Sequence, residues 1–125
     1  MTKKILLDTN FLVAPFQFGF DIYDELEKMF PYADLYTLED ALQEAKSIKS
    51  GKYKELVPKM LEKQDVELLT AEGDGEVDDL IVNISDDFIV ATNDKELKRR
   101  LKKKGRPVII IRSMTHLEVV NSEEY

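Results

Sequence analysis

The stretch Lys4-Ile5-Leu6-Leu7-Asp8-Thr9-Asn10 decides the fold of this chain. Its apolar run from Ile5 to Leu7 is unbroken, which is the pattern of a parallel strand covered on both faces. Asp8 follows at the carboxyl end of that strand. In open α/β sheets, ligands bind in the crevice outside the carboxyl ends of the strands. The stretch therefore predicts a buried first strand over residues 4–8 and makes Asp8 a candidate site residue.

Length and composition narrow the class of protein. A chain of 125 residues, 34% charged and 43% apolar, is typical of one globular domain over residues 1–125, although the segment after about residue 112 has no clear pattern. The absence of cysteine excludes disulfides, thiolate zinc sites and cysteine nucleophiles. No apolar run approaches the roughly 20 residues of a membrane span, and the N-terminus does not resemble a signal peptide. We expect a cytoplasmic protein that does not enter a membrane.

Charge is distributed unevenly along the chain. The net charge is −7, which by itself argues against a polyanionic partner. Residues 72–79 are dense in acid, however, and residues 95–104 are strongly basic. A protein that separates its charges in this way could hold metal cations at one place and contact phosphates at another.

The rest of the chain alternates between strand and helix patterns. Further strands are predicted at residues 33–37, 66–70, 87–92 and 107–111, and helices at 21–30, 38–48, 52–64, 76–85 and 95–104. This alternation predicts an α/β fold with a central parallel sheet of about five strands flanked by helices. Thr37 is a plausible N-cap for the helix that follows it. Pro58 predicts either a kink in the helix over 52–64 or a later start for it.

The segment from Phe11 to Phe20 is unusually rich in apolar residues and is broken by Pro15 and Gly19. One interpretation is a helical turn and loop packed on the sheet. The other is that part of the segment stays exposed and forms a subunit contact, because large exposed apolar patches usually mark interfaces. The second interpretation predicts a homodimer.

Two carboxylates are predicted at the same edge of the sheet. Asp8 ends the first strand, and Asp94 follows the fourth strand in the block Ala91-Thr92-Asn93-Asp94. If these strands are neighbours, the two side chains face each other where the strand order reverses.

Two helices can bring further acids to this edge. At 100° per residue, Glu44 and Glu39 lie at opposite borders of the apolar arc of the helix over 38–48. On the helix that starts at Glu76, Asp78 lies beside the apolar arc and in the first turn, where the helix dipole favours an anion. Asp79 lies on the far side and is the weaker candidate.

Carboxylates gathered in one place repel one another unless cations neutralise them. Their oxygens suit hard cations such as Mg²⁺ or Mn²⁺. Two such ions can activate a water and stabilise the leaving oxygen in phosphodiester cleavage. This chemistry needs no protein nucleophile, and His116, the sole histidine of the sequence, lies near its end.

Four blocks of the sequence together resemble the PIN-domain nucleases. They are Ile5-Leu6-Leu7-Asp8-Thr9-Asn10, the helix with Glu44, Val77-Asp78-Asp79-Leu80-Ile81, and Val90-Ala91-Thr92-Asn93-Asp94-Lys95-Glu96-Leu97-Lys98. Their order matches that family over almost the whole chain. Glu44 fits the family's second acid best, with Glu39 as its rival, and the residue after Glu44 is not the usual leucine.

The resemblance implies a PIN fold with strand order 3-2-1-4-5 and a Mg²⁺- or Mn²⁺-dependent endoribonuclease. It implies that the catalytic metal ligands are Asp8, Glu44, Asp78 and Asp94, and that the supporting residues are Thr9, Asn10, Asp79 and Thr92. The block Ala91-Thr92-Asn93-Asp94 followed by a basic helix is similar to archaeal and ribosome-processing PIN proteins. It is less similar to the toxin nucleases that are paired with antitoxins.

Alternatives to an RNA-processing nuclease remain open at this point. The chain could be a toxin ribonuclease with an antitoxin partner, or a silent PIN-like module that only binds RNA or protein. A ribosome-assembly partner is expected for the processing role. The basic helix is either a solvated face or an RNA contact formed by four of its residues, Lys98, Arg99, Lys102 and Lys103.

Overall fold

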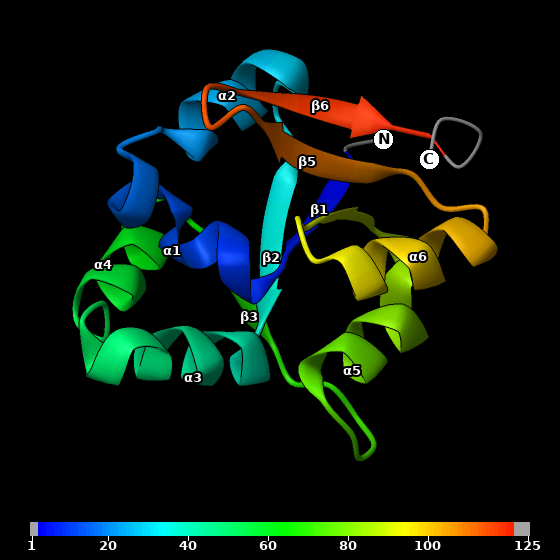
Figure 1. Ribbon diagram of the computed structural model, residues 1–125, viewed down its shortest axis with the longest axis horizontal. Helices are drawn as coiled ribbons and strands as arrows, with labels where there is room; N and C mark the ends of the chain where they lie inside the picture. Colours follow the sequence, from blue (N-terminus) through cyan, green and yellow to red (C-terminus); the bar gives the residue numbers. More distant parts are fainter. Residues whose placement is uncertain (1–2, 122–125) are drawn as a thin grey trace.

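The strands of the molecule lie in one sheet with the order β3-β2-β1-β4-β5-β6 (Figure 1). The computed structural model describes residues 3–121. The strands are β1 Lys4–Leu7, β2 Asp34–Leu38, β3 Glu67–Leu69, β4 Ile89–Ala91, β5 Val108–Arg112 and β6 His116–Val120. Neighbours pair in parallel except β5 and β6. The predicted α/β class and the order 3-2-1-4-5 are confirmed, with one strand added.

The added strand β6 forms an antiparallel hairpin with β5, in which Ile111 pairs with Leu117. No pattern in the sequence predicts a strand over residues 116–120. In the turn, Ser113 and Met114 both have φ of +55°. Left-handed backbone is usually indicated by Gly or Asn, and neither is present here. The hairpin therefore lacks the local sequence signal that would have predicted it.

Strand β1 lies at the centre of the core. Ile5, Leu6 and Leu7 have no exposed surface, as the unbroken apolar run predicted. Leu7 pairs with Thr37 of β2 on one side and with Ala91 of β4 on the other. The first and fourth strands are thus neighbours, which is the condition for their carboxyl-end acids to meet.

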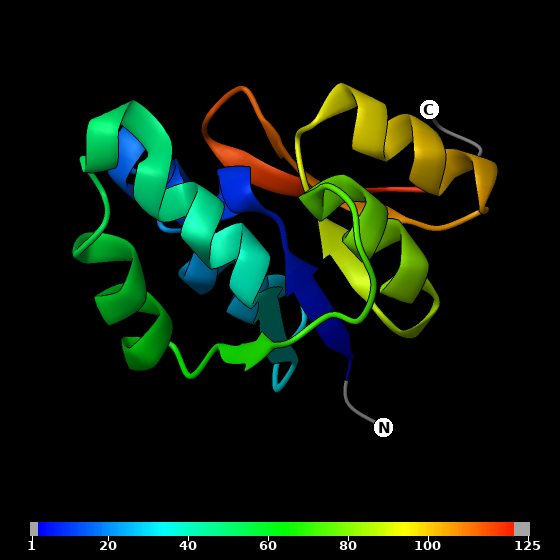
Figure 2. The same ribbon diagram turned by 90° about the horizontal axis from the view of Figure 1, so that it is seen from below.

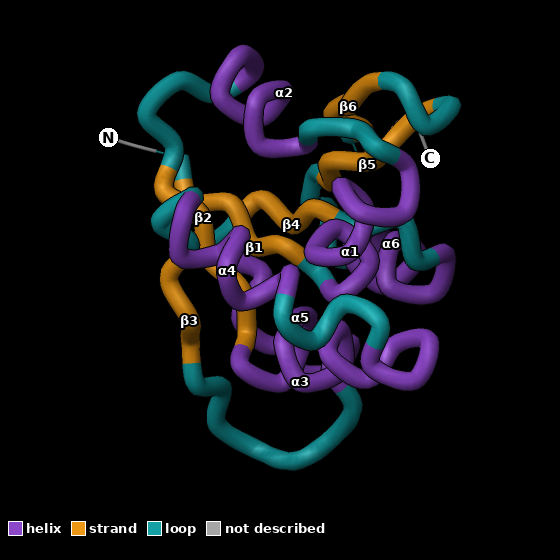
Figure 3. Tube along the Cα trace, turned by 90° about the vertical axis from the view of Figure 1, so that its left-hand side faces the viewer, coloured by secondary structure: helices purple, strands orange, loops and turns teal. Residues whose placement is uncertain are grey.

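Helices follow the strands in the predicted alternation. They are α1 Thr9–Phe18, α2 Ile22–Met29, α3 Glu39–Ser47, α4 Leu56–Lys63, α5 Val77–Ile84 and α6 Lys95–Lys103, with short 3-10 helices η1 Ile48–Gly51 and η2 Ser85–Asp87. Figure 2 shows α3 and α4 on one side of the chain that leaves β1, and α5 and α6 on the other. Figure 3 shows β3 at the outer edge of the sheet, followed by the loop that leads to α5. No helix within residues 3–121 combines the length and apolar character needed to span a bilayer.

The aromatic segment from Phe11 to Phe20 is mostly part of the core. Phe11, Leu12 and Val13 on α1 are at most 1% exposed. Phe16 stacks on Tyr53 with the ring centroids 6.0 Å apart. Phe18 is 45% exposed, and Gly19 ends the helix in left-handed conformation. This arrangement supports the packing interpretation for most of the segment.

The structure also corrects one helix boundary and resolves another. Thr37 is not the N-cap of α3, because β2 continues to Leu38 and the Thr37 hydroxyl donates to the buried Leu7 carbonyl at 2.7 Å. Helix α4 starts at Leu56, which agrees with the later start considered for that helix. Pro58 then falls in the first turn, where its missing N–H has no intrahelical partner to lose.

Candidate active site

Asp8 lies at the carboxyl end of β1 and caps the N-terminus of α1. Its side chain is buried, with 3% of the residue exposed. Oδ1 accepts a hydrogen bond from the Thr9 backbone N–H at 2.8 Å. Oδ2 accepts from the Thr92 hydroxyl at 2.6 Å and from the Asn10 amide at 3.1 Å. Three donors therefore fix the orientation of this buried carboxylate.

Thr92 connects the first and fourth strands at this point. Its hydroxyl donates to Asp8 and accepts from the Asp94 backbone N–H at 3.0 Å. The Asn10 amide also lies 3.3 Å from this hydroxyl, and the Asn10 carbonyl oxygen accepts from the Asn93 N–H. Asp94 in turn caps α6, with Oδ1 accepting from the Leu97 N–H at 2.8 Å. The predicted residues Asp8, Asn10, Thr92 and Asp94 thus form one network.

Thr9 contributes its backbone to this network, while its side chain is isolated. The Thr9 Oγ1 atom is buried and has no hydrogen-bond partner among the residues that the structure describes. A buried hydroxyl without a partner is unusual. The residue that follows Asp8 therefore has a buried hydroxyl oxygen without a hydrogen-bond partner within residues 3–121.

Glu44 and Glu39 differ in which part of the molecule they face. Glu44 on α3 precedes the buried Ala45, and its charge acts on both Asp8 and Asp78. Glu39 instead accepts a hydrogen bond from the Thr70 hydroxyl at 3.0 Å, beside the end of β3. The structure thus associates Glu44 with the predicted cluster and directs Glu39 elsewhere.

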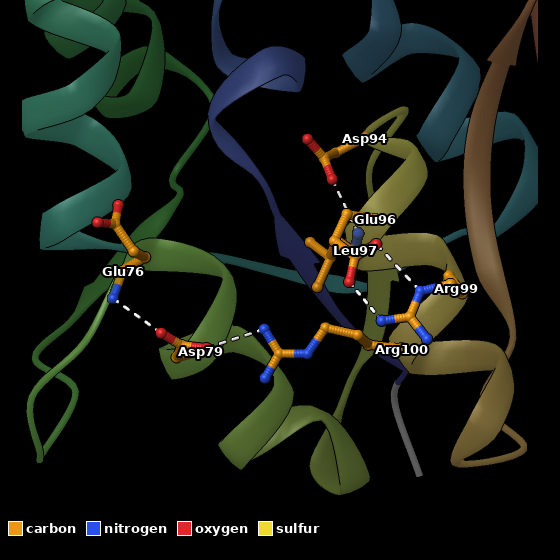
Figure 4. A network of polar contacts seen from close by, with 7 residues as sticks. All are labelled: Glu76, Asp79, Asp94, Glu96, Leu97, Arg99 and Arg100. Atoms are coloured by element: carbon orange, nitrogen blue, oxygen red, sulfur yellow. Dashed lines mark hydrogen bonds and ion pairs between the residues drawn. The ribbon is translucent and has the colours of Figure 1, made fainter.

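Asp78 and Asp79 also differ in orientation. Asp78 in the first turn of α5 is half-buried and interacts electrostatically with Asp94, Asp8 and Glu44. The Asp79 side chain instead accepts from the Glu76 backbone N–H at 3.0 Å and pairs with Arg100 on α6 at 2.9 Å (Figure 4). The preference for Asp78 over Asp79 agrees with this geometry.

Burial and the neighbouring acids raise the pKa values of Asp8 and Asp78. Burial is the largest cause of the raised pKa of Asp8, opposed by hydrogen bonds from Thr92 and Thr9. The charges of Glu44 and Asp94 raise it further. Burial, followed by the charge of Asp94, raises the pKa of Asp78 to about 6. Both shifts have the direction expected for carboxyl groups that are shielded from water and surrounded by other acids.

The donor set has the chemistry of a site for a hard cation. Carboxylate oxygens are the ligands that Mg²⁺ and Mn²⁺ prefer, and a cation would relieve the repulsion within the cluster. Within residues 3–121, no three acidic or histidine side chains are arranged closely enough to hold one ion as they stand. Asp8 and Asp94 direct oxygens to protein donors, and no such hydrogen bond holds Glu44 or Asp78 among residues 3–121. The cluster fits such an ion by its chemistry, and binding would require Glu44 and Asp78 to adjust.

Two residues that sequence reasoning missed support this site. The Asn93 side chain donates to the Ile111 carbonyl at 3.0 Å and accepts from the Ile111 N–H at 2.7 Å, which anchors the turn before Asp94 to β5. Arg100 joins α6 to α5 through Asp79. Helical spacing places Arg100 beside the buried Leu97 and Leu101, and this spacing could have distinguished it from the exposed Arg99 and Lys103.

The basic helix α6 is partly neutralised by the one acid that it contains, Glu96. Arg99, one of the four predicted RNA contacts, is paired with Glu96 in the first turn (Figure 4). Lys98 and Lys102 recur at helical spacing on the opposite side of α6 from Arg100. This strip begins one turn after Asp94.

Comparisons with known proteins agree with this arrangement. A family model described as a PIN-like domain matches residues 5–114. Ribonuclease VapC4 of Methanocaldococcus jannaschii is 32% identical over 126 residues, covering 93% of this chain and 95% of that protein. The solved structure of the PIN domain endonuclease Utp24 superposes with a TM-score of 0.77 at 24% identity, covering 93% of this chain and 90% of that one. Because the family model matches most of its length, the chain belongs to the PIN-like domain family.

Proposed function

We propose that this protein is a divalent-metal-dependent endoribonuclease whose ligands are Asp8, Glu44, Asp78 and Asp94. The observation that carries the proposal is that Thr92 joins Asp8 to Asp94 at the carboxyl ends of the neighbouring strands β1 and β4. The charge of Glu44 acts on Asp8, and that of Asp8 acts on Asp78. The family assignment and the similarity to Ribonuclease VapC4 support RNA as the substrate. The presence of all four acids disfavours a silent binding module.

Each part of the site has a distinct role in this proposal. Mg²⁺ or Mn²⁺, when bound, supplies Lewis-acid activation of water and stabilises the leaving oxygen. Thr92, Thr9 and Asn10 hold the Asp8 carboxylate in one orientation through the bonds described above. Outer-shell donors of this kind fix the orientation of metal ligands. Glu44 and Asp78 complete the site from the two helices on either side of it.

The basic face of α6 is proposed to contact the RNA backbone. Lys98 and Lys102 form a strip that starts close to Asp94, with Arg99 and Lys103 next to it on the helix. Such contacts bind phosphates without reading sequence, so RNA binding should weaken as salt increases.

The cellular role and the partners are also part of the proposal. The block Ala91-Thr92-Asn93-Asp94 followed by a basic helix favours a role in RNA or ribosomal RNA processing, with a ribosome-assembly partner. A toxin role with an antitoxin is the alternative, and toxicity on expression would favour it. A homodimer through the exposed Phe18 is a further proposal.

The wild-type protein tests the proposal directly. We expect labelled single-stranded RNA to be cut with Mn²⁺ or Mg²⁺ and to remain intact with EDTA, because the acids need a cation to act together. Calorimetric titration with Mn²⁺ measures metal binding separately from cleavage. Binding of Mn²⁺ without cleavage of any RNA would contradict the nuclease proposal, and failure to bind Mn²⁺ would contradict the metal site itself.

A matched pair of variants tests the second acid. We expect Glu44→Gln to reduce cleavage and Mn²⁺ affinity by about tenfold or more, because it removes a charge that acts on both Asp8 and Asp78. We expect Glu39→Gln, on the same helix, to keep the cleavage rate and the Mn²⁺ affinity within twofold of the wild type, since Glu39 accepts a hydrogen bond from Thr70 instead. The reverse ranking would make Glu39 the ligand. The measurements are single-turnover cleavage rates and calorimetric Mn²⁺ titrations.

A further inference from the structure

Asp79 and Arg100 form the ion pair that joins α5 to α6 (Figure 4). Arg100 Nη1 donates to Asp79 Oδ1 at 2.9 Å, and the two side chains are 30% and 43% exposed. Asp79 Oδ2 accepts from the Glu76 backbone N–H at 3.0 Å, and the Glu76 side chain completes a capping box at the start of α5. Both oxygens of Asp79 are therefore engaged away from Asp8.

Each of the two joined helices starts with an acid of the site. Asp78 is in the first turn of α5, directly before Asp79. Asp94 is the N-cap of α6, and its Oδ1 binds the N–H of Leu97, one turn before Arg100 (Figure 4). The ion pair thus connects the first turn of α5 to the last turn of α6. Since the carboxylates of Asp78 and Asp94 repel each other, a link between the helices opposes their separation.

Gly75, in the loop before α5, leaves room for the side chain of Asp79. Gly75 has φ of +130°, and a Cβ atom at that position would lie 2.8 Å from Asp79 Oδ2. Such a contact is far inside van der Waals distance, so a side chain at residue 75 would displace the Asp79 carboxylate. Glycine is needed here for both its backbone conformation and the close approach.

We propose that Asp79 and Arg100 are positioning residues that set Asp78 relative to Asp94 and so shape the metal site. The inference rests on the proposed nuclease function. It assigns Asp79 a role through Arg100 rather than as a substitute ligand for Asp78. Arg100 pairs with Asp79, and its charge opposes the rise in the pKa of Asp78. Its role therefore differs from that of the proposed RNA contacts.

The direction in which Mn²⁺ affinity changes when Arg100 is substituted distinguishes a positioning role from a purely electrostatic one. Arg100 is a cation near a cation site, so removing its charge without moving anything should strengthen Mn²⁺ binding. A positioning role predicts the opposite. We expect Arg100→Gln, Asp79→Asn and the double variant each to weaken Mn²⁺ binding by a similar factor of about ten, with Arg100→Lys restoring part of it.

The experiment uses calorimetric Mn²⁺ titration, kcat and KM for RNA cleavage, and amide NMR shifts of the metal-free protein. We expect kcat to fall with Mn²⁺ affinity, KM for RNA to stay within twofold, and the amide shifts of both Asp78 and Asp94 to change. Asp86→Asn is the matched control, because it removes an Asp whose partner, Lys104, follows the far end of α6. We expect it to change none of these quantities.

Two results would overturn the proposal. One is Mn²⁺ binding by Arg100→Gln that is unchanged or tighter than that of the wild type. The other is unchanged amide shifts at Asp78 and Asp94 in that variant. The shifts need neither metal nor RNA, so they test the pair even if the wild type proves not to cut RNA.

Discussion

Asp8→Asn is expected to reduce RNA cleavage by at least about a hundredfold, the upper end of what loss of an outer-shell partner costs a metal site. Asp8 is the most buried acid of the cluster, and three donors hold it in place. Asparagine has the same shape but no charge, so the cluster loses the anion around which it is arranged. Single-turnover cleavage with Mn²⁺ measures the effect.

The same substitution should leave the protein folded. Burial and the neighbouring charges raise the pKa of Asp8, so the ionised side chain destabilises the metal-free fold relative to a neutral one. Removing this unfavourable buried charge offsets the hydrogen bonds that are lost when an amide, with one oxygen acceptor, faces three donors. We expect the melting temperature in EDTA to change by about 3 °C or less. We also expect Mn²⁺ to raise the melting temperature of the wild type but not of the variant.

Asp86→Asn serves as the control for both measurements, because Asp86 is exposed and pairs with Lys104 away from the cluster. Cleavage by Asp8→Asn within twofold of the wild type would show that Asp8 is not in the active site. Loss of cleavage together with a collapse of the melting temperature would attribute the effect to folding instead.

Much of this architecture was predictable because local signals and tertiary structure agree. The run from Ile5 to Leu7 forms a central strand since it is apolar on both faces. Asp8 and Asp94 are linked through Thr92 because they follow adjacent parallel strands. Helical spacing places Glu44 and Asp78 beside apolar arcs, where the charge of Glu44 acts on both Asp8 and Asp78.

The features that escaped prediction depend on contacts between distant segments. Thr37 has the residue type of an N-cap, but its hydroxyl is taken by the Leu7 carbonyl across the sheet. The pairing of Asp79 with Arg100 depends on how α5 packs against α6, which neither helix specifies alone. In the turn between β5 and β6, Ser113 and Met114 adopt the left-handed backbone conformation. Neither residue type prefers that conformation, so the sequence does not indicate the hairpin.

Thr92→Val is expected to give the largest loss of stability, about 3 kcal/mol at neutral pH. The Thr92 hydroxyl is buried and connects two acids of the site, donating to Asp8 and accepting from the Asp94 N–H. Valine keeps the shape of the side chain but removes both bonds. Cleavage should also fall by about 10- to 100-fold, because Asp8 loses the donor that orients it. Chemical denaturation in EDTA and single-turnover cleavage measure the two effects.

The pH dependence of this loss identifies its cause. The bond from Thr92 lowers the pKa of Asp8 and opposes the larger effect of burial, so the pKa should rise further in the variant. A raised pKa means that the fold loses stability as pH increases through it, and the variant loses more than the wild type. The difference in stability between the wild type and Thr92→Val should therefore be largest at pH values above the pKa of Asp8 in both proteins. It should shrink as the pH falls and Asp8 becomes protonated. Thr92→Ser keeps the hydroxyl and should show no such trend. A deficit in Thr92→Val that stays constant across this range would indicate a packing defect unrelated to the Asp8 charge.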